Sequence, residues 1–194
     1  PQVAIISDEI YEYINYTGRH ESIAQFEELK DRVVLINGMS KGFAMTGWRL
    51  GYMAGPREVI QACEKLQGQV TSATCSITQR ASVAALRGDL APTHKMVEAF
   101  RQRRDYVIGA LKKMPGVKSN DPQGAFYAFP DISSFFGKQH NGHTINNDDD
   151  MSMYLLHEAH VATVCGSAFG DNNCIRLSFA TSMTNLMGAM ERMS

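Results

Sequence analysis

The stretch Asn37–Gly55, NGMSKGFAMTGWRLGYMAG, follows directly on the apolar run Arg32–Ile36, RVVLI. Such a short run, rich in β-branched residues, is typical of a buried strand. Five glycines, the only tryptophan of the chain, one lysine and one arginine then come in quick succession. Glycine permits close backbone approach and positive φ angles, and we expect Gly42 and Gly47 to provide both. A buried strand is thus followed at once by a charged, glycine-rich loop, and the chemistry of that loop decides the interpretation.

The composition is that of a globular protein. The 194 residues are 44% hydrophobic and 20% charged, which is enough for one large domain or two small ones. Nineteen basic residues stand against twenty acidic ones, so we expect neither nucleic acid nor an anionic membrane as a partner. No apolar run approaches the ~20 residues that a membrane span requires.

The cysteines and histidines predict no metal site. Cys63, Cys75, Cys165 and Cys174 form no C-x-x-C pair, so we expect free thiols in a reducing compartment, the cytoplasm. The sequence HEAH at 157–160 is similar to a truncated zinc helix. The zinc motif needs histidines at i and i+4, however, and these are at i and i+3. We favour an exposed helical face.

Apolar patterning and turn residues predict strands that alternate with helices, which is typical of an α/β fold. In the first half we expect strands at Val3–Ile6, Arg32–Ile36 and Leu50–Ala54, and helices at 22–30, from Pro56 to about Gln69, and from 79 to a stop at Gly88. A long amphipathic helix is expected from Pro92 to a point before Pro115.

The second half of the sequence has a different pattern of strands, loops and helices. We expect strands at 124–130, Val161–Val164 and Cys174–Phe179, a polar loop at 137–150, and a helix Met151–Ala159 capped by the preceding aspartates. A final helix is expected to carry Leu186, Met187, Met190 and Met193 at the spacing of a core-facing stripe. We place a domain boundary near residue 90. The expected domains are therefore 1–90 and 91–194, with the long helix as the connector.

The first residues, PQVAIISDEIYEYI, lack an initiator methionine and enter a buried strand at once. A buried strand needs neighbours on both edges. We therefore expect the sequence to begin in the middle of a domain.

Two kinds of chemistry can be set aside for the stretch Asn37–Gly55. Gly38–Gly42 matches the G-x-S-x-G elbow of serine hydrolases, but that elbow must feed a long helix, and Gly42, Gly47 and a further strand follow instead. The phosphate-binding motif G-x-x-x-x-G-K-[ST] is absent.

A lysine that forms a Schiff base fits better. Such a lysine must be unprotonated, which partial burial favours, and Lys41 follows a buried strand among apolar residues. Asp8 ends the other buried strand, with Tyr11 close behind, and Arg49 could hold an anion. A pyridine cofactor needs a lysine, a carboxylate, a donor and a cation for its phosphate. Because the carboxyl ends of parallel strands converge on one crevice, Asp8 and Lys41 are expected to meet there.

Three segments carry a resemblance to a known family. SDEIYEYI, SKGFAMTGWRLGYMAGP and IRLSFATS resemble signatures of the fold-type I, pyridoxal-phosphate-dependent aminotransferases, and most closely the class I branch that contains bacterial aspartate aminotransferases. The resemblance runs from the first residue to the last. It implies an α/β fold: part of the large domain, as a three-layer α/β/α remnant, plus an α+β small C-terminal domain. It also implies a homodimer for the full-length protein.

The resemblance implies a role for each candidate residue. Lys41 would carry pyridoxal 5'-phosphate as an aldimine and act as the catalytic base. Asp8 would pair with the pyridine nitrogen, Tyr11 with the phenolic oxygen, and Arg49 with the phosphate. Arg176 would bind the substrate α-carboxylate. On sequence grounds alone, Asp8 could instead be a helix cap, Tyr11 a core aromatic and Arg176 a solvent-facing charge.

The sequence departs from the family pattern at two places. Many relatives have a phosphate-binding serine where this chain has Gly38, and Ser40 could substitute for it. Relatives also tend to read P-G-S-A-F-G where this chain has Cys165–Gly170, CGSAFG. We expect Cys165 to loosen the backbone there.

The activity implied is amino transfer between an L-amino acid, with aspartate favoured, and 2-oxoglutarate. A lyase or synthase on the same scaffold remains an alternative, as does a non-catalytic truncated module. The first half of the family's fold, with much of its dimer interface, is absent from this sequence, so we expect a C-terminal half that is inactive alone.

Overall fold

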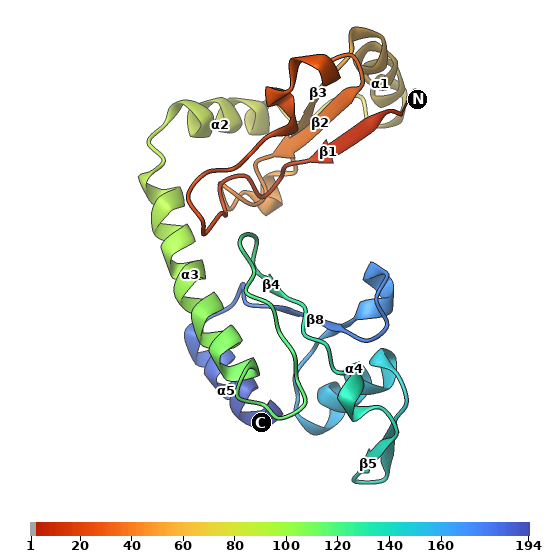
Figure 1. Ribbon diagram of the computed structural model, residues 1–194. Helices are drawn as coiled ribbons and strands as arrows, with labels where there is room; N and C mark the ends of the chain where they lie inside the picture. The colour runs from red at the N-terminus through yellow and green to blue at the C-terminus, as the bar shows by residue number, and fades with distance from the viewer. Residues whose placement is uncertain (1–2) are drawn as a thin grey trace. The chain divides into compact units, whose positions relative to one another are not determined.

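The computed structural model describes residues 3–194 (Figure 1). The chain forms two compact units, one that ends at Val97 and one that runs from Glu98 to Ser194. The division falls inside the long helix α3 (Ala91–Leu111). The expected domains 1–90 and 91–194, of which residues 1 and 2 lie outside the described part, stay a prediction. Among the described helices, none is long and apolar enough to cross a membrane.

The sheet of the first unit has three strands in the order β1-β2-β3 (Figure 1). β1 (Ile5–Asp8) and β2 (Val33–Gly38) are parallel, and β3 (Gly51–Ala54) is antiparallel to β2. The three strands lie where the sequence predicts them. β1 begins at Ile5 rather than Val3, because its partner strand begins only at Val33 and the register pairs these two residues.

Three α-helices follow the sheet along the chain: α1 (Arg57–Val70), α2 (Ser76–Arg87) and α3. Pro56 precedes α1 with a φ of −54°, which the proline ring favours. Gly88 ends α2 with extended rather than left-handed backbone. The expected helix 22–30 is instead two short 3-10 helices, Ile23–Gln25 and Glu27–Leu29, separated by extended backbone at Phe26.

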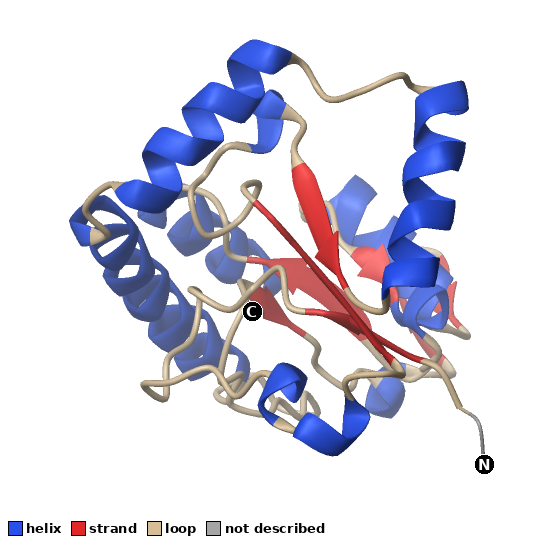
Figure 2. Ribbon diagram, turned by 90° about the horizontal axis from the view of Figure 1, so that it is seen from above, coloured by secondary structure: helices blue, strands red, loops and turns tan. Residues whose placement is uncertain are grey.

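The second unit contains a small antiparallel sheet in the order β4-β8-β7. Figure 2 draws the strands of the chain in red and the helices in blue. Its strands are β4 (Tyr127–Ala128), β7 (Val164–Cys165) and β8 (Ile175–Ser178), with helices α4 (Asp148–Glu158) and α5 (Met183–Met193). The expected strands 124–130 and Val161–Val164 are too long. Ala125 has a positive φ, and the Val161 N–H bonds to the Leu155 carbonyl at the end of α4.

A β-hairpin replaces the polar loop expected at 137–150. β5 (Lys138–His140) pairs with β6 (His143–Ile145). The turn between them is Asn141-Gly142, with φ angles of 48° and 81°, and Asn-Gly is a strong hairpin signal. Helix α4 also begins earlier than expected, because Asn147 caps it by accepting a hydrogen bond from the Asp150 N–H at 2.8 Å.

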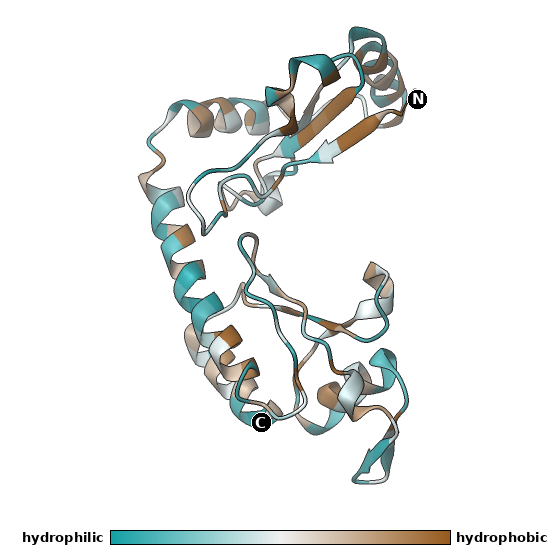
Figure 3. Ribbon diagram, in the orientation of Figure 1, coloured by the Kyte–Doolittle hydropathy of each residue, from teal (hydrophilic) through white to brown (hydrophobic). Residues whose placement is uncertain are grey.

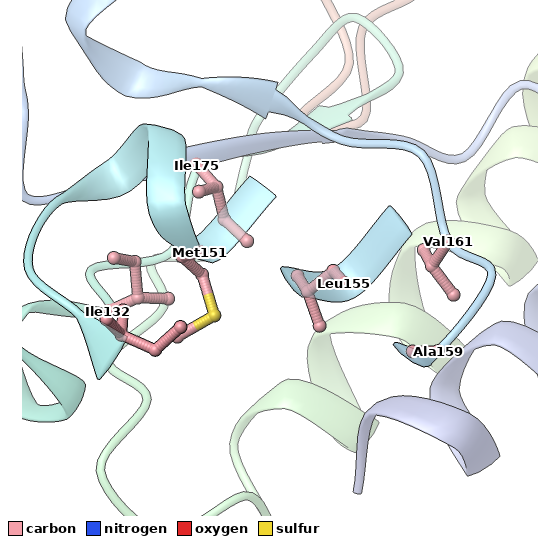
Figure 4. Packing of buried hydrophobic residues seen from close by; sticks show 7 residues of the cluster. Ile132, Met151, Leu155, Ala159, Val161 and Ile175 are labelled. Atoms are coloured by element: carbon pink, nitrogen blue, oxygen red, sulfur yellow. The ribbon is translucent and has the colours of Figure 1, made fainter. Parts of the chain in front are cut away.

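The second unit has its own hydrophobic core. Figure 4 shows its central cluster, which gathers side chains from α4, from β8 and from the segments beside them. The buried members are Ile132, Ile145, Met151, Leu155, Ala159, Val161 and Ile175. The antiparallel sheet and the hairpin are therefore packed against one helix.

Candidate functional site

The carboxyl ends of β1 and β2 lie at one edge of the first unit's sheet. Asp8 is the last residue of β1 and pairs in register with Ile36 of the parallel strand β2. Lys41 follows the end of β2 at Gly38. Asp8 is exposed, whereas Lys41 is half-buried. The fold thus brings the carboxylate and the lysine to the same edge, as the sequence predicts.

The turn that contains Tyr11 packs against the loop that contains Lys41. Backbone hydrogen bonds from Glu12 to Glu9 and from Ile14 to Tyr11 form this turn. Its Tyr13 ring meets the ring of Phe43 edge-on, with centroids 5.1 Å apart. Tyr11 therefore belongs to a turn that packs on the residues directly after Lys41.

The lysine loop is fixed by buried groups. Met39 is fully buried, and its carbonyl accepts a hydrogen bond from the Met45 N–H at 3.2 Å. The Lys41 carbonyl accepts from the Ala44 N–H at 3.2 Å. The hydroxyl of Thr93, itself buried, donates to the Gly42 carbonyl at 3.0 Å. Because the backbone is held at several points, the position of Lys41 is well determined.

The glycines act differently from the prediction. A Cβ on Gly42 would come within 2.5 Å of the Tyr13 ring, so the expected close approach is present there. Neither Gly42 nor Gly47 has a positive φ, and Gly47 has open space around it. The left-handed backbone falls instead on Ala44 and Arg49, at 53° and 54°. The prediction was therefore wrong for Gly47 and half right for Gly42.

Gly38 has a structural reason to lack a side chain. A Cβ there would lie 2.9 Å from the Leu50 carbonyl oxygen and 3.0 Å from the Cα of Gly51, with which Gly38 pairs. A serine at this position would push β3 away from β2. Ser40, two residues on, is half-buried at the same edge of the sheet.

Arg49 occupies a strained position. It ends the 3-10 helix Thr46–Trp48 in the left-handed region, and its Nη1 donates to the Thr46 carbonyl at 2.9 Å. A non-glycine residue there costs roughly 1–3 kcal/mol, and such strain is concentrated at functional sites. The guanidinium itself is exposed. It is therefore available to an anion at the surface.

Sequence reasoning missed Glu9, which fixes the end of β1. This carboxylate is 6% exposed. It accepts hydrogen bonds from the Ser7 hydroxyl, the His20 Nε2, the Ser22 hydroxyl and the Ile23 N–H, at 3.1, 2.8, 3.0 and 3.1 Å. Burial alone would raise the pKa of Glu9, but these hydrogen bonds outweigh it and hold the pKa below its ordinary value. The only signal in the sequence was an acid directly after Asp8.

Arg176 lies in the second unit, on β8. Its guanidinium carbon is 4.5 Å from the centre of the Tyr127 ring and 4.0 Å from that of Phe169. The side chain is half-buried. No carboxylate within residues 3–194 forms an ion pair with it. It is thus neither a freely solvated surface charge nor a neutralised one.

The residues described offer no cluster of three or more potential metal ligands. In the HEAH segment, Glu158 pairs with His143 at 3.5 Å and accepts from Asn141 at 3.2 Å. The thiols of Cys63, Cys75, Cys165 and Cys174 are free.

The chemistry of the first unit's groups fits a phosphorylated pyridine cofactor. Such a group needs an amine, a carboxylate, a phenol and a guanidinium. Lys41, Asp8 and Tyr11 supply the first three at one edge of the sheet, and Arg49 lies in the loop that leads from Lys41 to β3.

Comparison with known proteins supports the same family. The aminotransferase class I and II family matches residues 2–193. A bifunctional aspartate aminotransferase and glutamate/aspartate-prephenate aminotransferase of Petunia hybrida is 49% identical over 99% of this chain and 41% of its own length. The aspartate aminotransferase of Rhizobium meliloti is 45% identical over the whole chain and 48% of its own length.

Solved structures agree. The crystal structure of a Rhizobium meliloti aspartate aminotransferase matches 98% of this chain and 48% of its own, with a TM-score of 0.93 and 45% identity. That of Thermotoga maritima aspartate aminotransferase matches 98% and 46%, with a TM-score of 0.84 and 40% identity. The chain spans about half the length of these relatives. With its α/β fold and its lysine loop, the chain belongs to the class I and II aminotransferases.

Proposed function

We propose that the protein encoded by the whole gene is a pyridoxal-phosphate-dependent aminotransferase. It moves an amino group between an L-amino acid, with aspartate the favoured donor, and 2-oxoglutarate. The observation that carries this proposal is the half-buried Lys41 at the sheet edge where Asp8 ends the neighbouring parallel strand. The names of the relatives, most of which contain aspartate, support the choice of donor.

Lys41 is the catalytic residue. When bound, pyridoxal phosphate supplies an electron sink for the charge that develops on the substrate α-carbon. The Lys41 Nζ would hold the cofactor through its aldehyde carbon. Once released, it would accept the proton that leaves the α-carbon of the donor amino acid in one half-reaction and donate a proton to the α-carbon of the product amino acid in the other. The hydrogen bonds to the Met39 and Gly42 carbonyls hold the backbone on both sides of Lys41 for these tasks.

The other groups bind and orient. Asp8 accepts a hydrogen bond from the Ile10 N–H through Oδ1 at 3.2 Å, and its carboxylate holds a proton on the pyridine nitrogen. Tyr11 donates to the phenolic oxygen. Arg49 and Ser40 bind the phosphate, Arg49 through the planar fork that suits such an anion.

Arg176 binds the substrate α-carboxylate. A guanidinium matches a carboxylate with two parallel hydrogen bonds, and no carboxylate of the described residues neutralises this one. The proposal also includes a homodimer and a cytoplasmic location. The first rests on the resemblance to class I aminotransferases, and the second on the four free thiols.

Borohydride reduction of the gene-encoded protein, loaded with cofactor, tests the lysine. Peptide mapping is expected to find the cofactor on the peptide that contains Lys41. Label on Lys30 or Lys65 instead would overturn the assignment.

A single-turnover experiment separates amino transfer from the lyase alternative. With L-aspartate alone, an aminotransferase releases one oxaloacetate per site and stops until 2-oxoglutarate is added. A lyase or synthase turns over repeatedly without an acceptor. Because several relatives are named for both aspartate and prephenate, prephenate should be offered as a second acceptor. Turnover with prephenate but not 2-oxoglutarate would contradict the proposed acceptor.

A further inference from the structure

Arg176 is held by aromatic rings instead of acceptors. The rings of Tyr127 and Phe169 both lie within 4.5 Å of its guanidinium carbon. In the described part of the chain, this side chain has no hydrogen bond to a carboxylate or a carbonyl. A half-buried arginine whose cation–π partners are two rings, with no ion pair, is unusual, because a guanidinium has five N–H groups to satisfy.

Ring contacts fix a guanidinium without using its donors. The face of an aromatic ring attracts the cation electrostatically, while the N–H groups stay in the guanidinium plane. A long side chain that must be immobilised by its ligand weakens binding, whereas one that is already immobilised does not. The two rings therefore leave Arg176 ordered and its donors available to a carboxylate.

The sheet supplies the first ring. Tyr127 pairs with Ser178 in the β4–β8 ladder, two residues along β8 from Arg176. Its ring also packs on Phe126, with centroids 4.8 Å apart. The position of Tyr127 is thus set by the same strand that carries the arginine.

The second ring comes from a short loop. Phe169 ends the 3-10 helix Gly166–Phe169 and is 47% exposed. Its ring meets Phe129 edge-on at 6.2 Å and Arg176 at 4.0 Å. A phenylalanine that is half exposed contributes little to a hydrophobic core. Core packing therefore does not explain why Phe169 lies on Arg176.

A buried carboxylate holds this loop in place. Asp148 is 4% exposed, and its Oδ2 accepts a hydrogen bond from the Ser167 N–H at 2.7 Å. On the other side, the Gly166 N–H donates to the Cys174 carbonyl at 2.9 Å. A Cβ on Gly166 would overlap the carbonyl oxygens of Asp171 and Cys174. These contacts hold the loop in the position that places Phe169 on Arg176.

We propose that Tyr127 and Phe169 form an aromatic cradle that pre-organises Arg176 for the substrate carboxylate, and that Asp148 maintains the cradle by anchoring the Phe169 loop. The three are positioning residues, which act on the substrate through Arg176. The inference rests on the proposed function, because it takes Arg176 as the carboxylate ligand.

The test is substitution in the gene-encoded protein with cofactor bound. Phe169→Leu and Tyr127→Leu are expected to raise the KM for aspartate and the inhibition constant of a dicarboxylate such as maleate. The expected rise is about tenfold, equivalent to about 1.4 kcal/mol, and kcat should change little. Phe169→Tyr keeps a ring and should restore affinity. Asp148→Asn should act in the same direction as Phe169→Leu, with a smaller effect.

A matched control is available in the same unit. Phe135 lies against another cation, Lys138, at 4.9 Å, so Phe135→Leu removes a comparable contact away from Arg176. It should leave both constants unchanged. Binding of an amine that lacks the carboxylate should be equal in all variants, because Arg176 does not contact it.

Two failures can be told apart. If Arg176→Lys leaves dicarboxylate inhibition unchanged, the proposed role of Arg176 is wrong. If Arg176→Lys weakens inhibition but Phe169→Leu and Tyr127→Leu do not, only the cradle is wrong. If Phe169→Leu weakens binding of the amine as much as binding of the dicarboxylate, Phe169 is merely structural and the inference also fails.

Discussion

The two units differ in how far their apolar residues are buried. In the first unit Ile6, Leu66, Val70 and Ile77 are 71, 66, 79 and 71% exposed. In the second, Val107, Leu111 and Ile175 are each 1% exposed and Phe179 is fully buried. Figure 3 shows how hydrophobic β1 and β2 are, although Ile6 of β1 lies open. The second unit therefore has a core of its own, and the first presents surfaces that other residues should cover.

The candidate cofactor-binding residues lie in the unit with the more exposed apolar surface, whereas Arg176 lies in the other. The candidate residues Asp8, Tyr11, Lys41 and Arg49 belong to the unit with the open surfaces. In addition, β1 has only β2 as a neighbour in the described sheet, so its other edge is unpaired. We infer that the lysine site depends on cover that these residues do not provide, whereas the second unit is self-sufficient.

The largest effect is expected from the 194-residue chain by itself. It should fold in the second unit, bind pyridoxal phosphate weakly and without stoichiometry, and show no measurable amino transfer, because the cofactor site lacks the packing that pre-organises it. Hydrogen exchange should find protected amides after Glu98 and few before. Tight one-to-one binding of pyridoxal phosphate, with turnover, would contradict the inference that the first unit depends on cover from other residues.

The next effect concerns the lysine. In the gene-encoded protein, Lys41→Ala should lower kcat by roughly 10²–10⁴-fold or more, because a positioned proton-transfer group is lost. Steady-state rates with aspartate and 2-oxoglutarate measure it. Lys65→Ala, on α1, is the control and should keep full activity. Equal activity of the two variants would leave the first unit without a catalytic role.

A pair of leucine substitutions tests the contrast in burial directly. Leu155→Ala, in the core of the second unit, should lower the free energy of unfolding by about 2–5 kcal/mol. Leu66→Ala, on the exposed face of α1, should change it by no more than about 0.5 kcal/mol in the 194-residue chain. Urea titration measures both. In the gene-encoded protein a larger cost for Leu66→Ala would show that its face is covered there, and similar costs for both in the short chain would refute the contrast.

Glu9 predicts a pH dependence in the first unit. Its pKa in the folded protein lies below the ordinary 4.5, so its contribution is complete above that pH and is lost as the pH falls through the folded value. Glu9→Gln should cost about 1.5–3 kcal/mol at neutral pH, the range for hydrogen bonds to a charged group.

Urea midpoints of the gene-encoded protein between pH 7 and pH 3 measure this dependence. The difference between wild type and Glu9→Gln should shrink as the pH falls. Glu28→Gln, at an exposed acid, should not show this behaviour. A difference that stays constant with pH would mean that the ionised carboxylate is not what stabilises the turn.

The smallest effect is a gain in the second unit. Cys165 has a φ of −58°, which proline favours. Its pair with Ile175 is flanked by the hydrogen bond from the Gly166 N–H to the Cys174 carbonyl, so the Cys165 N–H lies outside the ladder. Cys165→Pro should therefore stabilise the chain by about 0.4–1 kcal/mol, measured against Cys165→Ala. A loss of stability would mean that proline does not fit this loop.

The sequence by itself determined what depends on neighbouring residues. The apolar run before Asn37 predicted β2, Pro56 and Gly88 marked helix ends, and the segment from Ser40 to Arg49 indicated a lysine site and the family. These signals are local, since a strand pattern, a cap or a motif is complete within a few positions. The Asn141-Gly142 turn was a local signal too, and it was overlooked.

Only the tertiary structure decided which distant residues meet. Glu9 bonds to His20 and Ser22, and Arg176 rests on Tyr127 and Phe169. Gly38 is required because the Leu50 carbonyl approaches it across the β2–β3 ladder. Such contacts depend on strand register and loop packing, which many sequences could satisfy in different ways. The physical reason is that side-chain pairing across long separations leaves no pattern in the residues between.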